Sequence, residues 1–272
     1  MDLPTAPAPR EERVSHCLLD ATGTVLSAAR PDASFYAAST IKLHVLLAAL
    51  RAADAGTLDL DRPVPATSRF LGADGSMFAL GGEHLDPTHP AEGMPIAVRE
   101  LLVRMIDRSS NEATDHVLSL LGLPAVAREI ERLALASTRV ERMIGDPAAL
   151  AAGATNETSA RDLALTMRVL VGASGPSGPG APAPLAPASR ALARHALRAQ
   201  RIRIIGPALR EGVDVGSKSG WVDGYRHDVA FLGEPDTADV RFLAVMTAGM
   251  RQEAADACIG RLVRELVPEL AR

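Results

Sequence analysis

The sequence predicts an α/β protein: a three-layer sandwich with a central antiparallel sheet, and an all-α domain inserted into it. β-prone runs lie near both ends of the chain, whereas the middle shows the spacing of amphipathic helices. Hydrophobic residues make up 47% of the 272 residues and charged residues 23%, so the chain can bury a core. We therefore predict an α/β domain from residues 11–52 plus 206–272, and an all-α domain from residues 53–205.

The first part of the chain predicts a hairpin, a helix and a long loop. Two β-prone runs flank residues 20–23, Asp-Ala-Thr-Gly, which is typical of a hairpin turn. A helix is expected from Ser39 to about Arg51, because apolar side chains recur there on one face. Residues 55–97 are rich in Gly, Pro and Asp and show little periodicity, so we expect mostly loop.

Helical spacing returns at Pro95 and is followed by further helices, three strands and a last helix. The segment 172–189, GASGPSGPGAPAPLAPAS, has low complexity and predicts a flexible surface insertion. The remaining expected elements are helices at about 111–121, 125–134, 160–171 and 190–200, strands at 213–218, 226–232 and 239–247, and a helix that ends near Pro268.

Charge and composition exclude several partners. A net charge of −4 without basic runs argues against nucleic acid, and no stretch of about 18 apolar residues predicts a membrane span. The N-terminus has no apolar signal-peptide core, so we expect a cytoplasmic protein, or a secreted one if an export signal preceded this sequence. We expect a monomer without a cofactor.

Neither the cysteines nor the histidines predict a metal site. Cys17 and Cys258 are too few for a disulfide scaffold or a cysteine site, and we expect buried thiols. His84, Asp86 and His89 have loosely metal-like spacing, but they lie in a Gly/Pro-rich loop without a further strong ligand set.

Ser39-Thr40-Ile41-Lys42 places a serine and a lysine on one face at the start of a helix. A serine becomes a nucleophile when a neighbouring base takes its proton, and a lysine is such a base when burial or a second cation destabilises its ammonium. The pattern alone is more typical of a helix cap followed by a surface lysine.

Two more short motifs follow. Ser109-Ser110-Asn111 ends an amphipathic helix, and Lys218-Ser219-Gly220 ends an expected strand. Each alone is typical of a polar turn, although a glycine at a strand end also permits close approach of a ligand.

Taken together and in this order, Ser-x-x-Lys, Ser-x-Asn and Lys-Ser-Gly resemble the motif set of class A β-lactamases and penicillin-binding proteins. The resemblance runs from Arg13 to Leu266 and is closest to class A. The segments that carry it are FYAASTIKLHVLLAAL, MPIAVRELLVRMIDRSSNEATDHVL and KSGWVDGYRHDVAFL. It implies the β-lactamase/transpeptidase-like fold and a serine hydrolase.

The resemblance implies a catalytic role for each matching residue. Ser39 is the acylated nucleophile and Lys42 the base for its proton. Ser109 passes that proton to the departing amide nitrogen. Asn111 holds Lys42 and the substrate's side-chain amide. Lys218 is a second cation that lowers the pKa values of the group and attracts a substrate carboxylate.

The resemblance also implies a substrate-binding strand. Ser219 and Arg226 bind the carboxylate, and Gly220 and Trp221 belong to the same strand and turn. The backbone N–H groups of Ser39 and Trp221 occupy the positions of an oxyanion hole.

The sequence departs from class A in the Ω-loop (residues 138–159). Class A enzymes carry there a Glu-Pro pair whose carboxylate activates the deacylating water, whereas a gap-free match puts Ile144 at the glutamate position. Asp146-Pro147 echoes the pair two residues later. Asp146 is either a displaced base or the start of a turn before Pro147.

The function predicted from these residues is hydrolysis of a β-lactam amide through an acyl-enzyme at Ser39, with weak deacylation. One alternative is a DD-peptidase, or another amide or ester hydrolase of the same fold, acting on a peptide-like carboxylate. The other is a protein that is acylated by β-lactams without turning over.

Overall fold

The computed structural model describes residues 9, 11–82, 85–172 and 183–272. The expected flexible insertion at 172–189 lies largely outside these residues. Its last three residues are helical, since they begin α7 (Pro187–Arg198).

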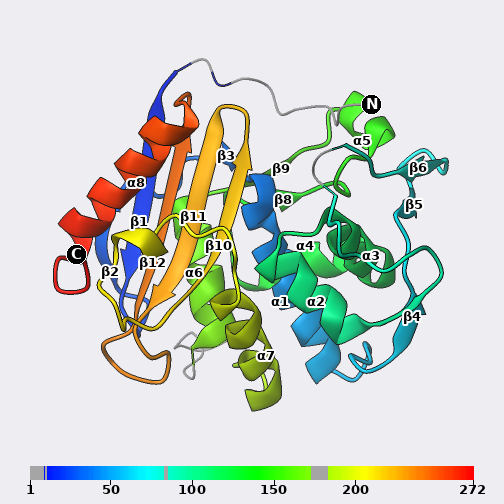
Figure 1. Ribbon diagram of the computed structural model, residues 1–272, viewed down its shortest axis with the longest axis horizontal. Coiled ribbons are helices and arrows are strands. Elements are labelled where there is room, and N and C mark those ends of the chain that lie inside the picture. The colour runs from blue at the N-terminus through cyan, green and yellow to red at the C-terminus, as the bar shows by residue number, and fades with distance from the viewer. Residues whose placement is uncertain (1–8, 10, 83–84, 173–182) are drawn as a thin grey trace.

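Strands from both ends of the chain form one antiparallel sheet in the order β10-β11-β12-β1-β2 (Figure 1). β1 pairs with β12 along its whole length, from Arg13 opposite Ala248 to Leu19 opposite Phe242. The sheet predicted from both termini is therefore confirmed. Its strands are β1 (Arg13–Leu19), β2 (Val25–Ala29), β10 (Val215–Val222), β11 (Tyr225–Leu232) and β12 (Arg241–Ala248).

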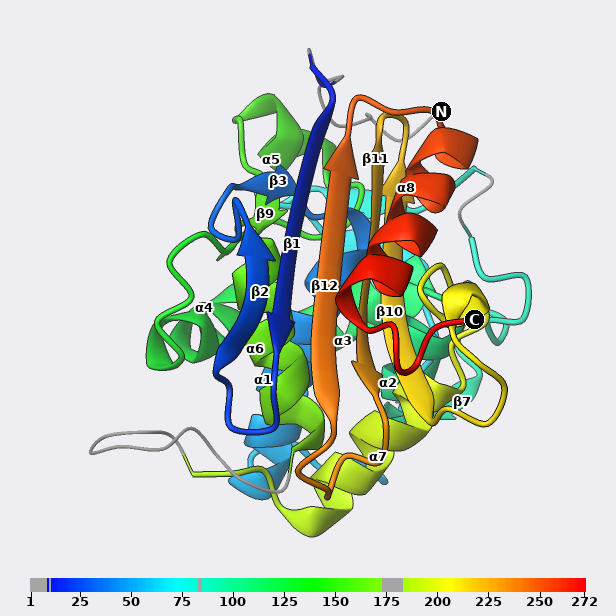
Figure 2. The ribbon, with the colours of Figure 1, turned by 90° about the vertical axis from the view of Figure 1, so that its left-hand side faces the viewer.

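Helices cover both faces of the sheet and make three layers. Figure 2 shows α8 (Gln252–Leu266) crossing the near face, with the other helices behind the strands. Alternate strand residues turn to opposite sides: Ala230 packs in the cluster that includes Ile259 of α8, whereas Val229 packs in the larger cluster on the far side. Because both faces are covered, all eight residues of β11 are buried.

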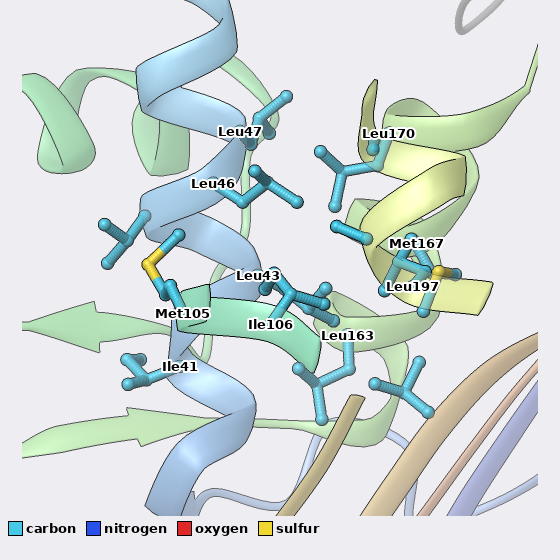
Figure 3. Packing of buried hydrophobic residues seen from close by; sticks show 14 of the residues in the cluster. Ile41, Leu43, Leu46, Leu47, Met105, Ile106, Leu163, Met167, Leu170 and Leu197 are labelled. Carbon is cyan, nitrogen blue, oxygen red and sulfur yellow. The ribbon is translucent and has the colours of Figure 1, made fainter. Parts of the chain in front are cut away.

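Helix α1 (Lys42–Asp54) lies between the sheet and the other helices (Figure 1) and is buried along most of its length. Figure 3 shows leucines of α1, among them Leu43 and Leu46, facing Leu163 and Met167 of α6. The remaining helices longer than one turn are α2 (Val98–Asp107), α3 (Asn111–Leu121), α4 (Leu123–Arg132), α5 (Pro147–Ala151) and α6 (Ala160–Val171).

The described part of residues 55–97 is mostly loop, as expected, but it also contains short strands that the sequence did not predict. Each strand has only three residues, and one buried residue is too little to produce a recognisable period. These strands are β4 (Pro63–Pro65), β5 (Arg69–Leu71), β6 (Met77–Ala79) and β7 (Pro95–Ala97). A further small sheet joins β3 (Phe35–Tyr36), β9 (Asn156–Thr158) and β8 (Arg139–Val140).

No helix in the described ranges is long and apolar enough to cross a membrane. Cys17 and Cys258 are buried free thiols, as expected.

Candidate active site

Three segments bring the predicted catalytic residues together: the turn before α1, the junction of α2 and α3, and strand β10. Ser39 lies in a short 3-10 helix (Ala38–Ile41) that packs against β10, and it is partly exposed. The helix predicted from Ser39 is thus a 3-10 turn first, and the α-helix proper begins at Lys42.

Two non-glycine residues at these junctions adopt left-handed backbone conformations. Ala38 has a φ of 46° and Ser109 a φ of 58°. Such conformations cost about 1–3 kcal/mol each and persist where the surrounding structure holds them. Ala38 directly precedes Ser39, and Ser109 presents both its carbonyl and its hydroxyl oxygen to Lys42.

Lys42 is completely buried, and its ammonium group has three acceptors. Nζ donates to the carbonyl oxygen of Ser109 at 2.6 Å, to Ser109 Oγ at 3.1 Å and to Asn111 Oδ1 at 2.8 Å. Burial, and then the positive charge of Lys218, lower the pKa of Lys42 well below its ordinary value. Burial and the second cation therefore favour the free base, the form that can accept a proton.

Lys218 approaches the same serine from β10. It is also fully buried, and its Nζ donates to Ser109 Oγ at 3.1 Å and to the carbonyl oxygen of Ser219 at 2.6 Å. Burial lowers the pKa of Lys218 to about 7, although the charges of Asp228 and Asp107 oppose the shift. Because both lysines donate to Ser109 Oγ, that hydroxyl keeps its own hydrogen for another acceptor.

Gly220 allows β10 to approach the turn that carries Ser39. A Cβ at this position would lie 2.8 Å from the backbone nitrogen of Thr40 and 3.0 Å from that of Ser39. The close approach is therefore made by the chain's own backbone rather than by a ligand. It brings the residue before Trp221 against the N–H of Ser39, where two backbone donors are needed for an oxyanion hole.

The remaining predicted binding residues lie along the β10–β11 hairpin. Ser219 is buried opposite Asp228, and Trp221 is 41% exposed opposite Arg226. Arg226 Nε and Nη2 donate to both carboxylate oxygens of Asp256 in α8, at 2.6 and 2.9 Å. This ion pair lies on the α8 face of the sheet, opposite to the face from which Lys218 reaches Ser109, so the structure does not bring Arg226 to the catalytic group.

A cavity of about 480 Å³ lies beside this hairpin. Trp221, Tyr225 and Arg226 line it from the hairpin, and Arg251 and Gln252 line it from the start of α8, whereas Ser39 and Lys42 do not. The cavity therefore shares no lining residue with the group of Ser39, Lys42, Ser109 and Lys218.

Asp146 caps the short helix α5. Its Oδ1 accepts the N–H groups of Ala148 and Ala149, and its Oδ2 accepts the N–H of Ala73 at 2.9 Å. This is the arrangement of the turn interpretation, in which Asp146 starts a turn before Pro147. With three backbone donors on its oxygens, the carboxylate has little capacity left for a water.

Ser110 replaces the aspartate that class A has in the second motif, and it has a structural role here. Its hydroxyl accepts the N–H of Ala113, which caps α3, and donates to Glu112 Oε2 at 3.0 Å. Glu112 Oε1 in turn accepts the N–H of Asp86.

Sequence reasoning missed Asp115. This residue of α3 is fully buried and accepts the N–H of Ile144 at Oδ1, 2.7 Å away. Burial raises the pKa of Asp115 well above its ordinary value, against the opposing effects of the Ile144 N–H, Lys42 and Arg142. The spacing of four residues from Asn111 is the signal that could have found it, since it places both on one helix face.

The loosely metal-like histidine segment is partly outside the described residues, which omit His84. Asp86 is used structurally there, because it accepts Thr88 and Arg104. The described residues contain no group of three or more metal-ligating side chains.

Comparisons with known proteins agree with this geometry. The model of the Beta-lactamase enzyme family matches residues 8–270. The fold is similar to that of a β-lactamase from Sphaerobacter thermophilus, with a TM-score of 0.76 and 25% identity over 95% of this chain and 91% of that one. A β-lactamase from Xanthomonas campestris gives a TM-score of 0.74 and 25% identity over the same shares.

An ancestral class A β-lactamase gives a TM-score of 0.72 and 26% identity over 94% of each chain. No curated protein sequence matches the chain significantly. The family match spans nearly the whole chain, and the solved structures share its fold from end to end. The chain therefore belongs to the β-lactamase enzyme family and is a serine hydrolase with the class A-like fold.

Proposed function

We propose that the protein hydrolyses the amide bond of β-lactams through an acyl-enzyme at Ser39. The observation that carries this proposal is the hydrogen-bonded group of Lys42, Ser109 and Lys218 beside Ser39, in which both lysines are fully buried. Burying a lysine destabilises its charged form. This pair therefore supplies both a base and a cation where acyl transfer needs them.

Acylation follows from these contacts. Lys42 takes the proton of Ser39, directly or through a water, while Oγ attacks the lactam carbonyl. The N–H groups of Ser39 and Trp221 stabilise the oxyanion. Ser109, whose oxygen is held by both lysines, donates its hydrogen to the departing nitrogen and recovers a proton from Lys42. Asn111 keeps Lys42 in place through Oδ1.

The substrate is a small carboxylate-bearing molecule. Lys218 supplies a buried positive charge for the carboxylate, and Ser219 of the same strand is the further group. We expect Arg226 to take no direct part, because Asp256 of α8 holds its guanidinium on the other face of the sheet. We propose a monomeric enzyme that needs neither nucleic acid nor a membrane.

In the proposed reaction, deacylation is the slow step. Ile144 has no ionisable group, and losing a general base typically slows a step by about 10²–10⁴-fold. The same observation supports a second candidate function, a β-lactam-binding protein that is acylated and turns over very slowly. A DD-peptidase uses the same acylation groups and remains the alternative for a peptide substrate.

Intact-mass spectrometry with benzylpenicillin, followed in time, tests the proposal. We expect one adduct per chain that forms rapidly and then decays over many turnovers, and no adduct on a folded Ser39→Ala protein. A stable adduct would favour the binding protein. Full labelling of Ser39→Ala would remove the assigned nucleophile.

A further inference from the structure

Asp115 is a buried carboxylate that the proposed acylation does not use. It lies one turn after Asn111 on the same face of α3, and Asn111 binds Lys42. Its Oδ1 accepts the N–H of Ile144. Asp115 is thus placed between the lysine-binding end of α3 and the Ω-loop position where class A carries its glutamate.

One oxygen of this carboxylate is left open. Asp115 Oδ2 is buried and accepts no hydrogen bond from the described residues. An unsatisfied buried acceptor typically costs about 1–3 kcal/mol, and more when it is charged. An asparagine would anchor Ile144 equally well through its amide oxygen, without a buried charge. Anchoring the loop therefore does not account for the carboxylate.

The other acidic groups around Lys42 and Asp115 are already occupied. Glu112 accepts from Asp86 N and from Ser110 Oγ, and Asp146 caps α5. The charged groups that face this pair are Lys218 of β10, Glu112 of α3, and Arg142 and Asp146 of the Ω-loop.

Building on the proposed function, we propose that Asp115 is a positioning residue for Lys42: its carboxylate balances the charge that Lys42 gains when it takes the proton of Ser39. Among the described residues, the acceptors of Lys42 Nζ are all neutral and lie on Ser109 and Asn111. Lys218 adds a second positive charge to the same pocket. A carboxylate beside Lys42 offsets that repulsion.

The opposed pKa shifts of the two residues agree with the proposal. Burial raises the pKa of Asp115 and lowers that of Lys42, and the charge of each works against the shift of the other. Groups coupled in this way titrate as a pair. Removing the carboxylate must therefore lower the pKa of Lys42 further.

The chain allows a direct test, because Lys42 and Lys218 are its only two lysines. Protein labelled with [ε-¹³C]lysine gives two signals, which Lys218→Arg assigns. In Asp115→Asn we expect the Lys42 signal to titrate about one pH unit or more lower than in the unsubstituted protein. An unchanged titration of Lys42 would overturn the proposal. Asp115→Ser, neutral and smaller, replaces the asparagine variant if that variant does not fold.

Asp162→Asn is the matched control. Asp162 is a buried carboxylate of α6 that also accepts one backbone N–H, from Ser137, and it lies outside the lysine cluster. We expect its loss to leave the Lys42 titration unchanged, and an equal shift in this control would make the effect of Asp115 non-specific and overturn the proposal.

The pH dependence of acylation gives a second readout. The rate rises as Lys42 loses its proton, so in Asp115→Asn the rising limb should move to lower pH and the plateau should fall. A displaced loop alone would lower the rate without moving the limb. The NMR titration needs no substrate, so it tests Asp115 even if penicillin fails to acylate Ser39, a result that would contradict only the proposed function.

Discussion

At the scale of single residues, the reactivity of the lysines at this site depends on their burial more than on their residue type. Lys42 and Lys218 are ordinary cations in the sequence, and complete burial is what lowers their pKa values. The resemblance to the class A motifs predicted that Lys42, Ser109, Asn111 and Lys218 belong to one site. It could not predict Asp115, because its importance depends on the Ω-loop that covers α3.

The carboxylate-binding role of Arg226 comes from the family resemblance alone, and it can be tested by substitution. If its guanidinium binds a substrate carboxylate, Arg226→Ala should slow acylation by carboxylate-bearing substrates by about 10- to 150-fold, since a charged hydrogen bond is worth about 1.5–3 kcal/mol. Neutral esters should be almost unaffected. Stopped-flow acylation kinetics with both substrate types make the comparison.

Asp256→Asn is the control for this prediction. It breaks the same ion pair but keeps the cation at Arg226. If Arg226→Ala and Asp256→Asn slow charged and neutral substrates equally, Arg226 only braces β11 against α8, and the carboxylate role is wrong.

At the scale of helices and strands, the long elements were predicted accurately from the sequence and the shortest ones were not. The helices α3 and α6 and the strands β11 and β12 were predicted within about two residues, because each carries several turns or alternations of apolar residues. The three-residue strands β4 to β7 and the five-residue helix α5 carry no such period. Their positions depend on tertiary contacts, such as the bond from Ala73 N to Asp146.

A substitution in the Ω-loop should have a measurable effect on the rate of deacylation. Ile144→Glu restores an ionisable group at the position that matches the class A base, so the acyl-enzyme should decay faster, by up to about 10²–10⁴-fold. Single-turnover mass spectrometry after removal of free penicillin measures the decay. An unchanged lifetime would mean that the loop does not place this side chain against the ester.

Asp146→Asn separates the two interpretations of that aspartate. Asparagine caps helices about as well as aspartate, so this change keeps α5 while removing the carboxylate. We expect the acyl-enzyme to decay at an unchanged rate. A slower decay with an intact acylation burst would identify Asp146 as the base after all.

At the scale of the whole molecule, the termini build the sheet and the segment between them builds most of the rest of the site. A single sheet built from both ends of the chain could be predicted from the positions of the β-prone runs. The contact between Gly220 and the backbone of Ser39 could not, because a glycine in a sequence does not reveal what approaches it. That contact joins the sheet edge to the helical side and fixes the site between them.

Burial of both lysines also predicts an unusual pH dependence of stability. Lys218 titrates at about 7 in the folded protein and at about 10.5 when unfolded, so the unfolded state binds more protons between these values. Stability must therefore rise with pH in this window, by about 1.4 kcal/mol per pH unit for each lysine that is neutral only when folded. The lowered pKa of Lys42 acts in the same direction. This protein has no further lysine, and its arginines keep their charge throughout the window.

We therefore expect the free energy of unfolding, measured by urea denaturation, to increase from pH 7 to pH 9. Cys17 opposes this trend only above pH 9, because burial raises the pKa of its thiol from 9 to about 11. Lys218→Met should remove the contribution of one lysine and flatten the profile, whereas Arg99→Met, on an exposed surface pair, should leave the slope unchanged. A flat or falling profile in the unsubstituted protein would show that the two lysines keep their charge in the folded state, and Lys42 could then not act as the base for Ser39.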